Sequence, residues 1–250
     1  MILERYEEPT WLSNTWLVAA GRGEDALLVD AGLDGETILA AAARHDLKIK
    51  MILLTHHHLD HAGHAAEIAR RTGAAVVAHE AEMPLFGRQT PVTQVVGDKA
   101  RLTCGSLSIQ TLHIPGHTAG QLAFHLEGAG LFTGDTLFRR SIGGTMAPGH
   151  TTFSDLRHSL LERLLAFPED EPVLPGHRLP STVGEERAQN PFLRVMLGVD
   201  PEGEETADLG GQEIGLVVWA RDYDGGHKAW IRRADGSQDV VPGSRIRRRS

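Results

Sequence analysis

The sequence predicts an α/β fold followed by a small C-terminal module made only of strands. Over roughly the first 175 residues, apolar runs of strand length alternate with segments of helical composition. Beyond an acidic stretch near residue 200, only strand-like segments follow. Of the 250 residues, 41% are hydrophobic and 23% are charged, which is typical of an ordinary soluble globular chain.

The first half of the chain predicts alternating strands and helices. Residues 14–19 and 26–29 are apolar and flank a glycine-rich turn signal, so we expect them to form a hairpin. Gly73 directly follows a helical segment, a position that favours a left-handed cap. In order, we expect strands over 14–19, 26–29, 49–54 and 74–78, and helices over 36–44 and 65–72.

The second half continues this alternation up to about residue 197. Leucines between residues 156 and 165 recur at helical spacing, and Ser154 stands before them as the expected N-cap. Pro191 is expected to break the last helical stretch in two. In order, we expect strands over 107–112, 121–126, 130–133 and 173–174, and helices over 156–165, 184–190 and 192–197.

A linker over residues 200–211 is expected to separate a main domain, 1–199, from a C-terminal module, 212–250. Residues 200–205 are acidic, contain Pro and Gly, and lack a periodic apolar face. Strands are expected over 214–221, 228–232 and 238–241, joined by Gly-containing turns. Because so short a module has a marginal core, we expect it to dock on the main domain or to form a homo-oligomer with a second subunit.

Charge and composition exclude several classes of function. With 25 Lys and Arg against 33 Asp and Glu, the formal net charge is −8, which argues against broad binding to nucleic acid or anionic membranes. The charged first eight residues lack the apolar centre of a signal peptide, so we expect a cytoplasmic protein without membrane contact. A single cysteine, Cys104, excludes an internal disulfide framework and a multi-cysteine zinc site.

Histidines are abundant and clustered, which points to metal chemistry. The chain has 14 histidines but only four lysines, and five of the histidines lie between residues 56 and 64. His56 and His58 directly follow an expected strand, and side chains two residues apart in extended chain point the same way, so both can bind one ion. Asp60 and His61 are adjacent in the chain, so we expect their side chains to point in different directions. This arrangement suits a second ion beside the first.

Three further ligand-type residues follow expected strands beside glycine. They are His117, Asp135 and His177, each preceded by Gly in the chain. Strand ends on one edge of a sheet are where α/β folds place their chemistry. For the first ion we expect three nitrogen ligands and one carboxylate that both ions share. For the second ion we expect two nitrogen ligands, one carboxylate of its own and the same shared carboxylate.

These motifs resemble the metallo-β-lactamase-fold hydrolases over residues 10–195. The resemblance rests on H-x-H-x-D-H, on Asp30 upstream of it, and on His117, Asp135 and His177 in the same order. It implies a four-layer αββα sandwich with a dinuclear site at one edge. It also implies seven metal ligands, namely His56, His58, Asp60, His61, His117, Asp135 and His177, and two divalent ions, zinc first, with iron or manganese as alternatives.

Within that family, the chain is similar to short bacterial glyoxalase II-like thioesterases. Residues 134–138 with 141–143 resemble the loop of that group after the bridging aspartate, and residues 181–193 resemble its C-terminal signature. Two departures stand out, because residues 144–146 are Gly-Thr-Met where Arg-Thr-Asp is usual, and Arg178 replaces a glycine. The resemblance therefore implies the metal chemistry but leaves open whether glutathione is the thiol.

The expected activity is hydrolysis of a small-molecule thioester or ester. A hydroxide shared by two metal ions would attack the carbonyl carbon while one ion polarises the carbonyl oxygen. Asp60 would orient this nucleophile and take its proton, and Asp30 would hold a ligand-bearing loop in place.

Three alternatives stay open at this point. A mononuclear iron persulfide dioxygenase shares much of the ligand set but would leave Asp60 and His61 without a metal. A metal-dependent nuclease on the same fold could use the basic residues 245–249, against the overall negative charge. A metal-stabilised scaffold with a partner-binding C-terminal module would need no open coordination position.

Overall fold

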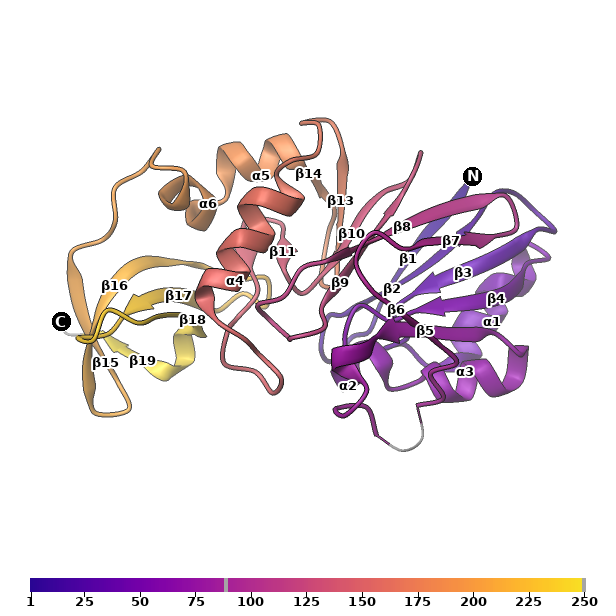
Figure 1. The fold of residues 1–250 in the computed structure, drawn as a ribbon, viewed down its shortest axis with the longest axis horizontal. Helices are drawn as coiled ribbons and strands as arrows, with labels where there is room; N and C mark the ends of the chain where they lie inside the picture. The colour runs from indigo at the N-terminus through magenta and orange to yellow at the C-terminus, as the bar shows by residue number, and fades with distance from the viewer. Residues whose placement is uncertain (88–89, 249–250) are drawn as a thin grey trace.

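The protein has two six-stranded sheets packed face to face, with helices on both outer surfaces. The computed structural model describes residues 1–87 and 90–248. In Figure 1 the first sheet lies on the right, the second sheet occupies the centre, and a separate C-terminal sheet lies on the left. The expected αββα sandwich with an all-β appendage is confirmed.

The first sheet has the strand order β1-β2-β3-β4-β5-β6. Strands β1 to β3 pair antiparallel, whereas β3 to β6 pair parallel, which needs the helical crossovers α1 (Gly35–Arg44) and α3 (Ala65–Thr72). The predicted hairpin and the left-handed cap at Gly73, with φ of 74°, are confirmed. The strands are β1 (Ile2–Glu7), β2 (Asn14–Ala19), β3 (Asp25–Val29), β4 (Lys48–Leu53), β5 (Ala75–His79) and β6 (Gln94–Val96).

The second sheet has the order β14-β13-β10-β9-β8-β7. All neighbouring strands pair antiparallel except β10 and β13, which are parallel and are joined through α4 (Phe153–His158) and the wider helical turn η2 (Ser159–Leu164). The strands are β7 (Arg101–Cys104), β8 (Leu107–His113), β9 (Leu122–Leu126), β10 (Gly130–Gly134), β13 (Pro172–Pro175) and β14 (Ser181–Thr182), and a small ribbon, β11 (Leu137–Phe138) with β12 (Ser141–Ile142), follows β10.

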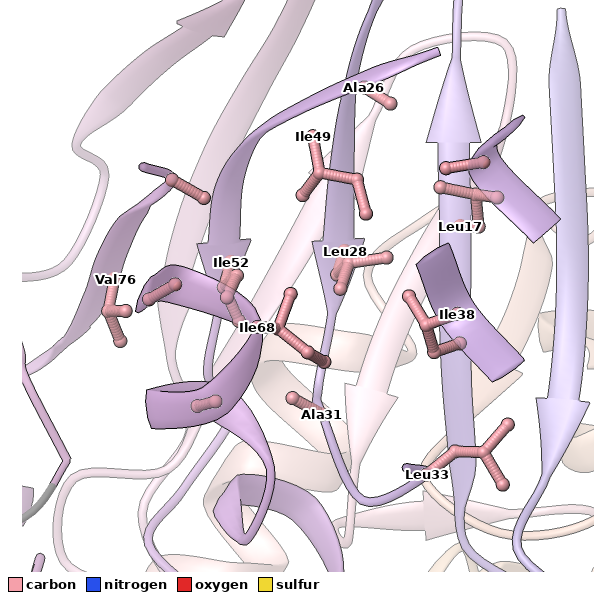
Figure 2. Close-up of a cluster of buried hydrophobic side chains, with 14 of the residues drawn as sticks. Leu17, Ala26, Leu28, Ala31, Leu33, Ile38, Ile49, Ile52, Ile68 and Val76 are labelled. Carbon is pink, nitrogen blue, oxygen red and sulfur yellow. The ribbon is translucent and has the colours of Figure 1, made fainter. Parts of the chain in front are cut away.

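Three apolar cores hold the layers together. Between the sheets, side chains such as Leu53 from the first sheet and Phe124 from the second are fully buried. On the outer face of the first sheet, Ile38 of α1 and Ile68 of α3 cover aliphatic strand residues (Figure 2). The outer face of the second sheet is covered by α4, η2, α5 (Val183–Gln189) and α6 (Pro191–Met196).

Two local predictions need correction. The N-cap of α4 is Thr152, not Ser154, because the Thr152 hydroxyl and the Asp155 carboxylate form a reciprocal capping box that starts the helix two residues earlier than an N-cap at Ser154 would. Pro191 does separate two helices, but it is itself the first residue of α6, where its missing N–H costs no hydrogen bond.

The C-terminal sheet has five strands and packs directly on the main domain. Its order is β18-β17-β16-β15-β19, and the strands are β15 (Glu205–Leu209), β16 (Gln212–Arg221), β17 (His227–Arg232), β18 (Gln238–Pro242) and β19 (Ile246–Arg248). Strand β15 lies inside the range expected as a linker, because its residues pair with both β16 and β19. Trp230 of β17 stacks on Phe153 of α4 at 4.8 Å between ring centroids, so the sheet shares the core of the helical layer.

The described helices include none that is both long and apolar enough to cross a lipid bilayer. The basic C-terminal residues are partly used within the fold, since Arg248 pairs with Glu205 at 2.7 Å and lies over the Trp219 ring. Arg249, part of the basic run noted in the sequence, lies outside the described residues.

Trp230→Ala tests whether the C-terminal sheet and the main domain unfold together. Trp230 is 4% exposed, so its loss should lower the free energy of unfolding by about 3–5 kcal/mol. Urea denaturation followed by circular dichroism should show one transition moved to lower urea. The control is Trp11→Ala, at a side chain that is 63% exposed, which should shift the midpoint far less. A second, separate transition in the Trp230 variant would show that the sheet is independent.

Candidate metal centre

Seven ligand-type side chains from four loops and a short helix meet at one edge of the two sheets. His56 and His58 follow β4, Asp60 and His61 lie on the single-turn helix α2 (Leu59–Ala62), and the others follow strands of the second sheet. Each strand ends at the same edge, so residues distant in the chain converge there. The structure brings together all seven predicted residues, namely His56, His58, Asp60, His61, His117, Asp135 and His177.

Three imidazoles form the first group. His56 Nε2 lies 2.9 Å from His58 Nδ1, and His117 Nε2 lies 3.1 Å from the same His58 atom. Ligands about 2.0–2.1 Å from a tetrahedral zinc ion are separated by roughly 3.3 Å, so this spacing suits a single ion. This is the group expected from the strand geometry of His56 and His58.

Asp60, His61 and His177 form the second group. His61 Nε2 lies 3.3 Å from Asp60 Oδ2 and 3.3 Å from His177 Nε2. The expectation that Asp60 and His61 diverge is wrong, because residues 59–62 form a helical turn and not extended chain. Neighbours on a helix are only about 100° apart, which lets both side chains reach the same point.

Asp135 lies between the two groups. Its Oδ2 is 3.2 Å from His177 Nε2 and 3.6 Å from His117 Nε2, and its Oδ1 is 3.3 Å from His61 Nε2. The Oδ1 atom is buried and has no hydrogen-bond partner within the described part of the chain. A buried carboxylate oxygen without a donor is costly, and a shared cation would satisfy it. The donor set therefore fits divalent metal ions.

The outward-facing ring nitrogens fix which imidazole atom is free to bind a metal. Backbone carbonyls can only accept, so a ring nitrogen that contacts one must carry its proton, and the other nitrogen presents a lone pair to the centre. The contacts are His58 Nε2 with Pro148 O at 3.1 Å, His117 Nδ1 with Gly144 O at 2.9 Å, and His177 Nδ1 with Trp11 O at 3.0 Å. All three rings therefore turn an unprotonated nitrogen toward the centre.

Burial and charge act on these groups in opposite directions. Burial lowers the pKa of His117 to about 4 and that of His56 well below its ordinary value, which keeps both rings neutral at neutral pH. Burial also lowers the pKa of His61, but the charges of Asp135 and Asp30 outweigh it and raise that pKa well above its ordinary value. The centre thus holds an excess of negative charge that favours cations.

Asp30 supports the ligands from behind, as the sequence predicts. It is 2% exposed, and its Oδ2 lies 2.8 Å from His61 Nδ1. Its Oδ1 accepts a hydrogen bond from the Thr55 backbone N–H at 2.8 Å, which fixes the start of the loop that carries His56. Asp30 has a φ of 60°, an uncommon conformation for a residue other than glycine that such a site can hold in place.

Glu82, which was not among the residues predicted from the sequence, ties two ligand loops together. This carboxylate is fully buried and accepts hydrogen bonds from the backbone N–H of His57 at 2.9 Å and of Gly120 at 2.7 Å. His57, a neighbour of two ligands, points to Glu82 instead of the centre. No local motif marks Glu82, because its partners come from loops that are 25 and 38 residues away.

A wide cleft of about 1030 Å³ opens above the centre. Its walls include His58, Asp60, His117, Asp135 and His177, so a bound molecule would face both groups. Exposed apolar side chains from several segments also line it, including Trp11, Leu59, Leu85 and Pro148. The cleft also includes Tyr223, from the turn between β16 and β17 of the C-terminal sheet.

The family model of the metallo-beta-lactamase superfamily matches residues 9–177. The chain belongs to this superfamily. Metal-dependent hydrolysis is typical of this superfamily, and the His/Asp groups described above have the composition and spacing that suit divalent metal ions.

Comparison with individual superfamily proteins gives the same family. A hydroxyacylglutathione hydrolase of Anaeromyxobacter dehalogenans is 34% identical over 217 residues, which cover 72% of this chain and 81% of the relative. The crystal structure of TTHA1623 in a di-iron-bound form has a TM-score of 0.67 and 34% identity, covering 76% of this chain and all of that one. The crystal structure of ETHE1 from Myxococcus xanthus has a TM-score of 0.68 and 27% identity, and the match covers 80% of this chain and 92% of that one.

Gly176→Ala tests the tight packing around the shared carboxylate of this metallo-β-lactamase-fold protein. A methyl group at Gly176 would lie 2.3 Å from Asp135 Oδ1, so Asp135 must move away from one of the two groups. Elemental analysis after metal loading should show a clear fall in bound metal per chain. Gly21→Ala is the control, because the nearest atom to its added methyl group is 3.9 Å away. Equal metal content in both variants would contradict a bridging role for Asp135.

Proposed function

We propose that this protein hydrolyses small-molecule thioesters at a centre of two divalent metal ions. The observation that carries the proposal is the presence of two ligand groups on either side of one buried carboxylate, Asp135. Similarity to hydroxyacylglutathione hydrolases supports thioesters over other acyl compounds. His56, His58 and His117 would hold one ion, Asp60, His61 and His177 would hold the other, and Asp135 would contact both.

Metal ions at these two positions would lower the pKa of bound water and polarise the carbonyl oxygen of the substrate. Zinc suits the nitrogen-rich donor set, and iron fits it as well, as the di-iron-bound form of TTHA1623 illustrates for that protein. The cleft above the centre admits a substrate to both groups at once.

Asp60 is the residue that we assign to proton transfer. Its side chain is 17% exposed toward the cleft, more than any other carboxylate of the centre, and its Oδ2 lies 3.4 Å from His177 Nε2. A carboxylate at this position can orient an attacking water molecule and accept its proton. Asp30 does not face the cleft, so we assign it only to holding His61 and the loop at Thr55.

The mononuclear dioxygenase alternative has less support from the geometry. It would leave Asp60 and His61 without a metal, yet both side chains meet His177 in a compact group. Oxygen consumption with glutathione persulfide, without thioester hydrolysis, would favour that alternative over the hydrolase. The nuclease alternative depends on basic C-terminal residues, and Arg248 is engaged with Glu205 and not presented beside the centre.

His58→Ala is the direct test of the two-metal hydrolase. Because His58 lies within 3.1 Å of both other imidazoles of the first group, its loss should reduce bound metal from two ions toward one. The rate of thioester hydrolysis, kcat/KM, should fall by more than about 100-fold. Metal content by elemental analysis and turnover of a thioester panel are the measurements.

The matched control is His158→Ala, since His158 is an exposed histidine on α4 far in sequence from every ligand. It should leave metal content and turnover unchanged. Two bound metal ions and full turnover in the His58 variant would refute the proposal. Full metal loading without hydrolysis of any thioester, ester or phosphoester in the wild-type protein would favour the scaffold alternative.

A further inference from the structure

A second cavity of about 360 Å³ lies beside the metal cleft and is rich in arginine. It shares one lining residue, Tyr223, with the cleft above the metal centre. Its walls come from β1, from the turn after β11, from the loop after His177 and from the C-terminal sheet, and its lining residues are Arg5, Glu7, Arg139, Arg178, Leu179 and Tyr223.

Tyr223 lines both cavities, so the two adjoin at its ring. Its ring stacks on the ring of His177 at 4.3 Å between centroids and 19° between planes, and it packs against Phe138 at 4.9 Å. Tyr223 lies outside residues 9–177, the part of the chain that the family model matches. The C-terminal sheet therefore places a side chain in direct contact with a ligand-type histidine of the centre.

The turn that carries Tyr223 is held firmly against the main domain. Asp222 forms an ion pair with the buried Lys228 at 3.0 Å and accepts a hydrogen bond from the Ser141 hydroxyl at 2.8 Å. Lys228 also donates to the Ile142 carbonyl at 2.8 Å. Burying a charged pair is costly unless it is hydrogen-bonded, and here Lys228 has both the Asp222 carboxylate and the Ile142 carbonyl as acceptors. The turn that carries Tyr223 is thus a fixed part of the structure.

Arg178 connects the arginine cavity to the turn that carries Tyr223. It follows His177 directly and has a φ of 61°, in the left-handed region that favours glycine. Its Nε donates to the Tyr223 carbonyl at 3.2 Å, and its Nη1 lies 3.3 Å from Glu7 Oε1. Strained backbone of this kind persists where surrounding contacts hold it, and it gathers at binding sites.

The cavity has an excess of positive charge. Three arginines face one carboxylate, because Glu7 pairs with Arg5 at 2.9 Å and with Arg178 at 3.3 Å. Arg139 is exposed, and its side chain has no hydrogen bond or ion pair within residues 1–87 and 90–248. The chain as a whole has a formal net charge of −8, so this cluster of guanidinium groups is a positively charged site on a negatively charged protein.

We propose that the arginine cavity binds the anionic end of the thiol half of the substrate, a carboxylate or a phosphate. Guanidinium groups bind both anions through paired N–H donors. The apolar walls of the metal cleft suit the acyl half, so the substrate would run from the centre past Tyr223 into the cavity. The inference rests on the proposed thioesterase function and adds to it the charge of the leaving thiol.

Arg139→Gln and Arg140→Gln make a matched pair of variants. Both remove one positive charge from the same exposed turn, but the Arg140 side chain bonds Gln189 and does not line the cavity. We expect Arg139→Gln to raise KM about tenfold for an anionic thioester with kcat little changed. Hydrolysis of a neutral N-acetylcysteamine thioester with the same acyl group should stay within twofold, and Arg140→Gln should change neither.

Two anionic thioesters distinguish the source of the negative charge. A glutathione thioester presents carboxylates, and a phosphopantetheine thioester presents a phosphate, with the acyl group kept constant. The one whose KM rises more in Arg139→Gln identifies the anion that the cavity prefers. An equal rise in KM for the neutral and both anionic thioesters would overturn the proposal, as would an equal effect of the two variants.

A binding measurement keeps this inference separate from the proposed hydrolysis. Calorimetric titration of the metal-loaded protein with inorganic phosphate should show affinity that Arg139→Gln weakens about tenfold and Arg140→Gln preserves. If the wild-type protein hydrolyses no thioester, this difference alone shows that the cavity binds anions while the proposed function fails. Equal phosphate affinity in both variants would overturn the cavity as an anion site, even in an active hydrolase.

Discussion

The structure of the site depends on one buried carboxylate, that of Asp135, placed between two groups of imidazoles. An ionised carboxylate in the protein interior must be compensated, and its Oδ1 receives no hydrogen bond within the described chain. The charges of His177 and His61 outweigh the effect of burial and lower the pKa of Asp135 well below its ordinary value. The surrounding fold can be understood as the framework that brings compensating groups to this point.

Close approach of the backbone makes that framework possible. Both Gly143 and Gly176 lie so near Asp135 that an added methyl group would overlap it, at 1.9 Å and 2.3 Å from its atoms. The parallel pair β10 and β13 delivers Asp135 and His177 side by side, because both residues follow adjacent strands at the same edge. Two sheets, instead of one, are needed because His56, His58 and His61 follow β4 of the first sheet, whereas His117 follows β8 of the second.

Much of this could be predicted from the sequence. The seven ligand-type residues stand out because short-range spacing, as between His56 and His58, and strand–glycine–ligand patterns are local features. The helical turn at Asp60 was missed, since four residues carry too little periodicity to indicate a helix. Glu82 and Tyr223 could not be found for a different reason, because their roles arise only from contacts with residues 25 or more positions away.

The C-terminal sheet shows how a short, marginal module can become part of a site. Its own core is small, so it gains stability by packing Trp230 on Phe153 of the main domain. That packing alone would not orient the turn at Tyr223; the buried contacts of Lys228 with Asp222 and with the Ile142 carbonyl do so. Apolar contacts tolerate sliding, whereas a buried ion pair has few satisfactory geometries. The position of the tyrosine ring against His177 therefore depends on this polar anchor more than on the area that the sheet buries.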